Sequence, residues 1–175
     1  MAIKTTAPVY LWTGDGWGKS TSSFGAALRA LGHGFPVVIV QFMKGRKEKI
    51  GEYKLRGKFG KLLHIEQFGR EGWVNLRKPS EHDRVLAQQG FEFAKKAAQK
   101  KPFLLILDEI NLAVAIGLLK ERDVIDFLDS LHWRTHVYLT GRKATPGLRA
   151  RADFVNEIVV RKGPKKLIGE RGIDY

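Results

Sequence analysis

A glycine-rich loop between an apolar run and a helix-like segment constrains this chain more than any other feature. Residues 9 to 21 read Val-Tyr-Leu-Trp-Thr-Gly-Asp-Gly-Trp-Gly-Lys-Ser-Thr. Glycines let the backbone turn its N–H groups inward, and the N-terminus of the following helix, together with Lys19, adds positive charge. The pattern therefore predicts a strand, a phosphate-binding loop and a helix, with the Ser20 hydroxyl on a Mg²⁺ that is shared with the phosphates.

One position departs from the general phosphate-loop pattern. That pattern has glycine six residues before the lysine, whereas this chain has Thr13 there and its first glycine at position 14. An alternative interpretation is an ordinary glycine-rich turn in which Gly-Lys-Ser occurs by chance. The strand and helix signals on either side favour the nucleotide site.

Composition limits the class of protein. With 175 residues and 43% hydrophobic content, the chain has enough apolar material for one compact domain covering residues 1–175. The absence of cysteine excludes disulfides and thiolate metal sites. The first residues lack the apolar core of a secretory signal and the apolar runs are strand-sized, so we expect a soluble cytoplasmic protein without a membrane span.

The chain is strongly basic. Its net charge of +13 favours anionic partners, whether nucleotides, nucleic acid or a membrane surface. Part of the excess lies between Lys44 and Lys61, where eight Lys or Arg accompany Glu48 and Glu52. A solvated, mobile loop is the alternative explanation for this segment.

Strand-like and helix-like segments alternate along the chain. Besides the run before the loop, we expect strands at 36–42, 62–68, 103–108, 136–142 and 154–160. We expect helices from the loop to Gly32, from Ser80 to about 99, from 111, from 122 to 131 and from Pro146 to 152. This order predicts an α/β fold with a mainly parallel sheet and helices on both faces.

Polar residues end two of the expected strands. Asp108 and Glu109 follow five large apolar residues, and Gln41 and Lys44 lie at the end of the strand 36–42. Ligands of open α/β sheets bind beyond the carboxyl ends of the strands, so we interpret Ser20, Asp108 and Glu109 as candidate ligands of a Mg²⁺-nucleotide. The alternative is that the two acids cap the helix that begins at once after them.

Several further motifs keep the order and spacing of one known family. They are Thr13 to Thr21, Arg29 to Gly34, Val40 to Gly45, Gly51-Glu52, Ile106 to Ile110, Leu139 to Arg142, Ala152-Asp153 with Glu157, and the terminal Gly172 to Tyr175. In these motifs the whole chain resembles the ATP:corrinoid adenosyltransferases of the phosphate-loop type. The displaced first glycine is itself part of that family's pattern.

The resemblance implies a fold, ligands and a reaction. It implies a RecA-like sheet, a homodimer, and Mg-ATP held by the loop backbone, Lys19, Ser20, Thr21, Arg29 and Glu109. It also implies that the Co(I) of a reduced corrinoid attacks the 5′ carbon of the ribose and that inorganic triphosphate leaves. Lys19, Ser20 and Glu109 are then the catalytic candidates, a reductase that supplies Co(I) is an expected partner, and nucleic acid and membranes are not.

Two positions depart from the family pattern. Members commonly have lysine where this chain has Trp17, and often have Gly-Phe-Thr-Trp where it has Gly72-Trp-Val-Asn75. We expect Trp73 to contact the corrinoid; its alternative role is a small core that covers the third strand. The expected ligand-binding residues are Gly14, Asp15, Gly16, Trp17, Gly18, Lys19, Ser20, Thr21, Arg29, Gln41, Arg142 and Trp73.

Two other functional classes stay open. A phosphate-loop ATPase that acts on nucleic acid agrees with the charge of +13 and a RecA-like sheet. A non-catalytic ATP-binding paralogue agrees with the substitutions at Trp17 and Asn75. The first would release orthophosphate in response to DNA or RNA, and the second would bind ATP without turnover.

Overall fold

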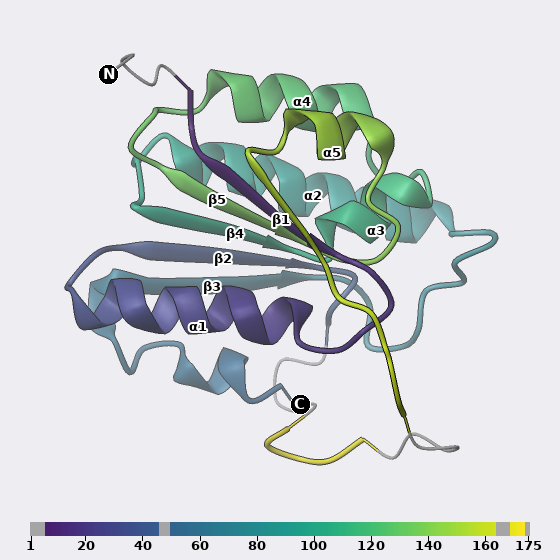
Figure 1. Cartoon of the computed structure of the whole chain (residues 1–175), viewed down its shortest axis with the longest axis horizontal. Helices are drawn as coiled ribbons and strands as arrows, with labels where there is room; N and C mark the ends of the chain where they lie inside the picture. The colour runs from purple at the N-terminus through teal and green to yellow at the C-terminus, as the bar shows by residue number, and fades with distance from the viewer. Residues whose placement is uncertain (1–5, 46–49, 164–168, 174–175) are drawn as a thin grey trace.

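A parallel sheet of six strands runs through the centre of the molecule (Figure 1). The structure is a computed structural model that describes residues 6–45, 50–163 and 169–173. The strands lie in the order β3-β2-β4-β5-β1-β6, and all neighbouring pairs are parallel. Their bounds are β1 Val9–Thr13, β2 Val37–Phe42, β3 Leu63–Phe68, β4 Leu104–Asp108, β5 His136–Thr140 and β6 Phe154–Glu157. The predicted parallel α/β architecture is confirmed.

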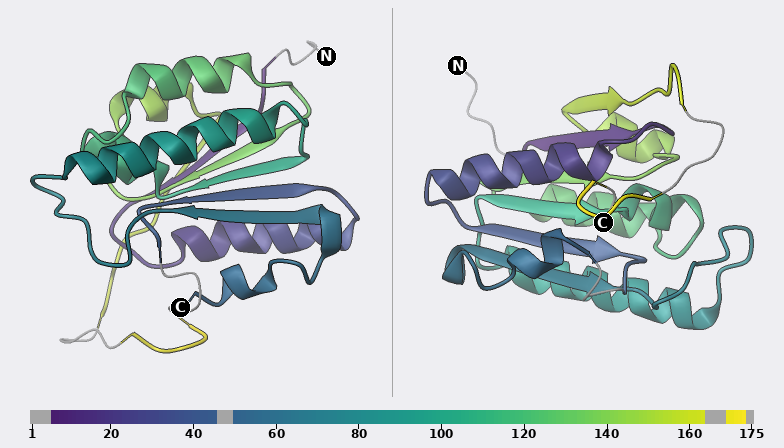
Figure 2. Two further views of the ribbon diagram at one scale, coloured as in Figure 1. Left: turned by 180° about the vertical axis from the view of Figure 1, so that it is seen from behind. Right: turned by 90° about the horizontal axis from the view of Figure 1, so that it is seen from below.

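Helices cover both faces of this sheet (Figure 2). On one face lie α1 and the 3₁₀ turn η1, and on the other lie α2, α3, α4 and α5. The bounds are α1 Lys19–Gly32, η1 Glu52–Leu55, η2 Gly60–Leu62, α2 Glu81–Ala98, α3 Ile110–Ala115, α4 Glu121–Ser130 and α5 Pro146–Arg151. Among the described residues, none of these helices has the length and apolar character needed to span a membrane.

Local sequence signals explain where the helices begin. The Ser80 side chain accepts a hydrogen bond from the Asp83 N–H, while Asp83 accepts one from the Ser80 N–H, which is the predicted capping box of α2. Pro146 occupies the first turn of α5, where its missing N–H costs nothing. Gly18, in a left-handed conformation, precedes α1.

The structure differs from the predicted elements in two places. The last strand ends at Glu157 and not at Val160, because its partner β1 ends at Thr13 and Ile158 then lies against the phosphate loop. Its N–H donates to the Thr13 carbonyl, and its carbonyl accepts from the Gly16 N–H, both at 2.9 Å. The described part of the basic segment forms η1 and η2 and is not an open loop; residues 46–49 lie outside the described ranges.

One edge of the sheet collects the candidate functional residues. Because the strands are parallel, all their carboxyl ends lie at that edge. It carries the phosphate loop after β1, Lys44 after β2, the loop that starts at Gly69 after β3, Asp108 and Glu109 at the end of β4, and Gly141 with Arg142 after β5.

Candidate functional site

The phosphate loop is held open by glycine and by the chain that follows β6. Gly14 has φ +94°, a conformation that L side chains rarely adopt. A Cβ there would lie 2.4 Å from the carbonyl oxygen of Ile158, and one at Gly16 would lie 2.5 Å from the Ile158 Cγ2. Both positions therefore need glycine. Ile158 was missed in the sequence because its contact with the loop spans 142 positions.

Lys19 is folded over this loop. Its side chain is 7% exposed, and its ammonium group donates to the carbonyl oxygen of Gly16. Burial lowers the pKa of the Lys19 amine, although the nearby charge of Glu109 opposes that shift. The Lys19 ammonium group therefore lies against the backbone of the loop.

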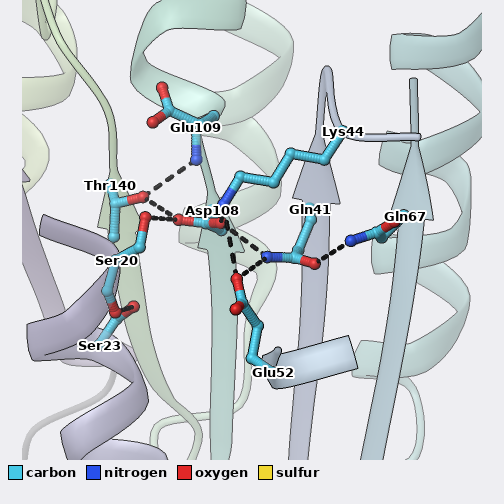
Figure 3. A network of polar contacts seen from close by, with 9 residues as sticks. All are labelled: Ser20, Ser23, Gln41, Lys44, Glu52, Gln67, Asp108, Glu109 and Thr140. Atoms are coloured by element: carbon cyan, nitrogen blue, oxygen red, sulfur yellow. Dashed lines mark hydrogen bonds and ion pairs between the residues drawn. The ribbon is translucent and has the colours of Figure 1, made fainter. Parts of the chain in front are cut away.

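Asp108 is the centre of a buried polar network at the foot of the loop (Figure 3). Its Oδ1 accepts hydrogen bonds from the hydroxyls of Ser20 and Thr140, both at 2.7 Å. Its Oδ2 accepts from Gln41 Nε2 at 3.0 Å and Lys44 Nζ at 2.6 Å. Burial opposes ionisation, but the charge of Lys44 and these hydrogen bonds hold the pKa of Asp108 below its ordinary value. The carboxylate is thus ionised and tied directly to Ser20.

Glu109 has a different environment from its neighbour. It adopts φ +67°, and its backbone N–H donates to the Thr140 hydroxyl at 3.0 Å. Burial and the charge of Asp108 raise the pKa of the Glu109 carboxyl. It stands at the N-cap position of α3 but makes no side-chain capping bond, and Asp108 bonds to four side chains. The capping interpretation of this acidic pair is wrong.

The network extends along the sheet edge through Gln41, which the sequence assigned to the site, and through three residues that were not among the expected ligand-binding residues. Gln41 stands opposite Gln67 on β3 and Asp108 on β4. Gln67 Nε2 donates to Gln41 Oε1 at 2.7 Å, and Gln41 Nε2 also donates to Glu52 at 3.1 Å. The Lys44 Nζ lies 3.8 Å from the Glu52 Oε1. Desolvation disfavours the charged form of Lys44, but the charge of Asp108 raises the pKa of Lys44. Gln41, Lys44, Glu52 and Gln67 therefore fix the Asp108 side of the site.

The remaining predicted residues divide into those near the loop and those away from it. Arg142 Nε lies 3.9 Å from Asp15 Oδ1, so the step after β5 meets the loop. Trp17 and Thr21 are exposed beside it. Arg29 lies in the last turn of α1, ten residues beyond Lys19, which is about 15 Å along the helix axis. It lines a surface pocket with Phe35, Phe103 and Tyr138, so the structure does not bring Arg29 to the phosphate loop.

Comparison with known proteins identifies the family. Residues 6–175 match the sequence profile of the family described as ATP:corrinoid adenosyltransferase BtuR/CobO/CobP. This chain belongs to the ATP:corrinoid adenosyltransferase family.

Relatives named as corrinoid adenosyltransferases support the same assignment. The one from Sinorhizobium sp is 34% identical over 182 residues, which cover 100% of this chain and 84% of that protein. The one from Pseudomonas aeruginosa is 32% identical, covering 93% of this chain and 81% of that protein. The one from Escherichia coli (strain K12) is 31% identical, covering 95% of this chain and 85% of that protein.

A solved structure supports the fold. The crystal structure of KaiC-like protein PH0186 from Pyrococcus horikoshii OT3 aligns with a TM-score of 0.57 at 16% identity, covering 93% of this chain and 76% of that one. At that identity the likeness concerns the fold alone, and it confirms the RecA-like phosphate-loop architecture.

The oxygen atoms at the foot of the loop fit the Mg²⁺ that the adenosyltransferase family implies. Mg²⁺ is commonly held by one or two carboxylates, with water and substrate phosphates completing its octahedron. Ser20, Asp108 and Glu109 supply hard oxygen donors here, and within the described ranges no group of three or more His, Cys, Asp or Glu forms an all-protein metal cage. A cation beside Glu109 would also relieve the burial and repulsion that raise its pKa.

Trp73 and Asn75, in the loop where this chain departs from the adenosyltransferase pattern, lie in different settings. The Trp73 side chain is 85% exposed in the loop between β3 and α2, so the alternative of a small core over the third strand is wrong. Asn75 Oδ1 accepts hydrogen bonds from the N–H groups of Arg77 and Lys78, at 3.1 and 3.2 Å. Asn75 therefore shapes the backbone of this loop.

Proposed function

We propose that this protein transfers the 5′-deoxyadenosyl group of ATP to the Co(I) of a reduced corrinoid and releases inorganic triphosphate. Membership of the family supports the transfer. The observation that carries the proposal is the glycine loop closed by Ile158, with Lys19 over it and the Ser20–Asp108 pair at its foot. That arrangement gives a polyphosphate fixed donors and positive charge.

The reaction needs positioning and charge stabilisation more than proton transfer. Co(I) supplies an electron pair to the 5′ carbon, a Co–C bond forms, the C5′–O bond breaks, and its electron pair leaves on the triphosphate oxygen. No proton has to move in this step. The loop N–H groups and Lys19 stabilise the leaving polyanion, and the rigid sheet edge holds the two reactants in register.

The metal would be held beside the same phosphates. We propose Ser20 and Glu109 as the protein ligands of Mg²⁺, with the ionised Asp108 orienting the Ser20 hydroxyl. When bound, the ion adds positive charge where the triphosphate leaves. Thr21 and Arg142 complete the proposed nucleotide contacts, and Trp73 is proposed to face the corrinoid.

The partners and the compartment are proposed from the family resemblance. We propose a homodimer that works in the cytoplasm and receives its corrinoid from a reductase that supplies Co(I). Light scattering on the purified protein tests the dimer directly.

The reaction products test the proposal. Protein, Mg-ATP and chemically reduced corrinoid are incubated without oxygen and followed by phosphorus NMR and visible spectroscopy. We expect inorganic triphosphate to appear in step with a light-sensitive Co–C bond, since all three phosphates leave as one unit. Without corrinoid, ATP should persist.

Two results would contradict this function. Accumulation of ADP and orthophosphate, faster with added DNA or RNA, would identify a nucleic-acid-dependent ATPase, because such enzymes break the terminal phosphorus–oxygen bond. ATP binding without turnover, even with reduced corrinoid, would identify a non-catalytic paralogue.

A further inference from the structure

The loop from 69 to 79 joins β3 to α2 and presents Trp73 to solvent. The Trp73 side chain is 85% exposed. Exposure of a large apolar side chain to water is unfavourable, and it is typical of surfaces that bind a ligand or a partner. What holds this loop in place therefore decides how Trp73 is presented.

The start of the loop is packed against the end of β2. A Cβ at Gly45 would lie 2.2 Å from the carbonyl oxygen of Gly69, and one at Gly69 would lie 2.5 Å from the backbone nitrogen of Lys44. The two backbones are thus in direct contact. Arg70 leaves this fixed point, next to the segment whose Lys44 bonds to Asp108.

The end of the loop is fixed by the first turn of α2. Asp83 is 4% exposed, and its Oδ2 accepts from the Ser80 N–H at 2.9 Å and the Ser80 hydroxyl at 2.7 Å. Its other oxygen, Oδ1, faces Arg70 Nε at 3.3 Å. One carboxylate thus serves both the helix cap and Arg70.

Arg70 also reaches the middle of the loop. Its terminal NH₂ group donates to the backbone carbonyl of Trp73. The guanidinium therefore spans from the ion pair with the buried Asp83 to the backbone of Trp73, through two different nitrogens, whereas lysine has a single nitrogen. Asn75 holds the second half of the loop through the N–H groups of Arg77 and Lys78.

We infer that Arg70 is a positioning residue that braces the Trp73 loop between α2 and the end of β2. The loop then holds the indole of Trp73 in its binding position before the corrinoid arrives. This inference rests on the proposed function. A loop fixed before binding loses less conformational freedom when the ligand arrives, so the brace improves corrinoid affinity without contacting the corrinoid. In this chain a braced loop with one aromatic serves where the family often has two aromatics.

The first measurement needs no substrate. The protein has four tryptophans, and labelling with 5-fluorotryptophan gives each a ¹⁹F signal; Trp73→Phe assigns the one of interest. In Arg70→Met, the ¹⁹F signal of Trp73 should narrow, and its chemical shift should move toward that of free 5-fluorotryptophan. The signals of the other three tryptophans should stay in place. Arg77→Met is the matched control, because it removes the same charge from the same loop and should leave the ¹⁹F signal of Trp73 unchanged.

The second measurement is steady-state kinetics. Arg70→Met should raise the corrinoid KM about fivefold, as expected for loss of a partly exposed polar anchor, with little change in kcat or in the KM for ATP. Arg70→Lys keeps the charge but has a single nitrogen and should lie between Arg70→Met and wild type. Arg77→Met should match wild type.

Several outcomes would overturn the inference. The first is an Arg70→Met protein in which the ¹⁹F signal of Trp73 does not move. The second is an Arg77→Met protein with the same shift of that signal and the same rise of the corrinoid KM as Arg70→Met. The third is an Arg70→Met protein with a rise of both KM values and a loss of thermal stability, which would indicate a purely structural role. A wild-type protein that forms no Co–C bond refutes the proposed function. An active wild type with an unmoved ¹⁹F signal of Trp73 in Arg70→Met refutes the brace alone.

Discussion

At the scale of single residues, the adjacent acids Asp108 and Glu109 lie in environments that shift their pKa values in opposite directions. Asp108 is paired with the charge of Lys44 and accepts hydrogen bonds from Gln41, Ser20 and Thr140, and its pKa is lowered. Glu109 is partly buried next to that charge, and its pKa is raised. A carboxyl that is destabilised by desolvation and by a like charge gains most from a cation, so we propose Glu109 as the metal ligand and Asp108 as the residue that anchors Ser20.

This division of roles predicts different responses to Mg²⁺. Lys19→Ala should lose a charge-assisted contact to phosphate of about 1.5–3 kcal/mol, and added Mg²⁺ should not restore it. Glu109→Ala should lose metal support, so its kcat/KM for ATP should recover in part as Mg²⁺ is raised. Activity measured across a Mg²⁺ titration distinguishes the two variants.

The control for charge is Lys100→Ala, at the amino-terminal edge of the sheet, which should behave as wild type. Equal recovery of Lys19→Ala and Glu109→Ala by Mg²⁺ would show that the assigned roles are wrong.

At the scale of elements, the sequence predicted what local chemistry determines. The continuous apolar runs of β2 and β4, the glycines of the loop and the Ser80–Asp83 cap each depend on neighbours in the chain, and each is confirmed. The register that sets Gln41 opposite Gln67 and Asp108 depends on strands far apart in sequence. For the same reason, the contact of Ile158 with the phosphate loop and the ion pair of Lys44 with Asp108 could not be foreseen.

The nucleotide contact expected of Arg29 stays a prediction. Arg29 follows Lys19 by ten residues along α1, so it lies away from the phosphate loop along the helix axis. A sequence pattern records spacing, whereas a helix converts that spacing into a fixed distance and direction.

The α2 cap predicts a pH-dependent stability. Burial disfavours the charge of Asp83, but its bonds to Ser80 and the charge of Arg70 lower its pKa overall. A lowered pKa stabilises the fold above the ordinary carboxyl pKa of about 3.9, and this contribution is lost as pH falls through the folded pKa. Asp83→Asn should therefore lose about 1 kcal/mol near neutral pH, or roughly 2–4 °C in Tm.

Urea unfolding across the acidic range measures this effect. The difference between wild type and Asp83→Asn should shrink toward zero as pH falls below the folded pKa. Asp123→Asn, which changes an exposed acid in the first turn of α4, should show a smaller difference. A difference for Asp83→Asn that stays constant with pH would contradict the role of its charge.

At the scale of the whole molecule, the binding that the net charge favours has to be distinguished from the reaction that the protein performs. The net charge of +13 predicts attraction to any polyanion, and the RecA-like fold is compatible with proteins of many activities. The phosphate loop and the Asp108 network, in contrast, lie together at one edge of the sheet, where we propose the nucleotide site. Binding of nucleic acid by itself is therefore weak evidence about function.

We accordingly predict that this protein binds DNA or RNA only through general electrostatics. Fluorescence anisotropy with a labelled oligonucleotide should show affinity that falls steeply and linearly in log[salt], without preference for sequence. The rate of ATP consumption, followed by phosphorus NMR with and without reduced corrinoid, should not change when the oligonucleotide is added at low salt. Lys19→Ala should bind the oligonucleotide nearly as well as wild type, because it removes one of 31 Lys and Arg residues. Corrinoid-independent ATP consumption that rises with oligonucleotide and disappears in Lys19→Ala would instead couple nucleic acid to the phosphate loop and overturn the adenosyltransferase assignment.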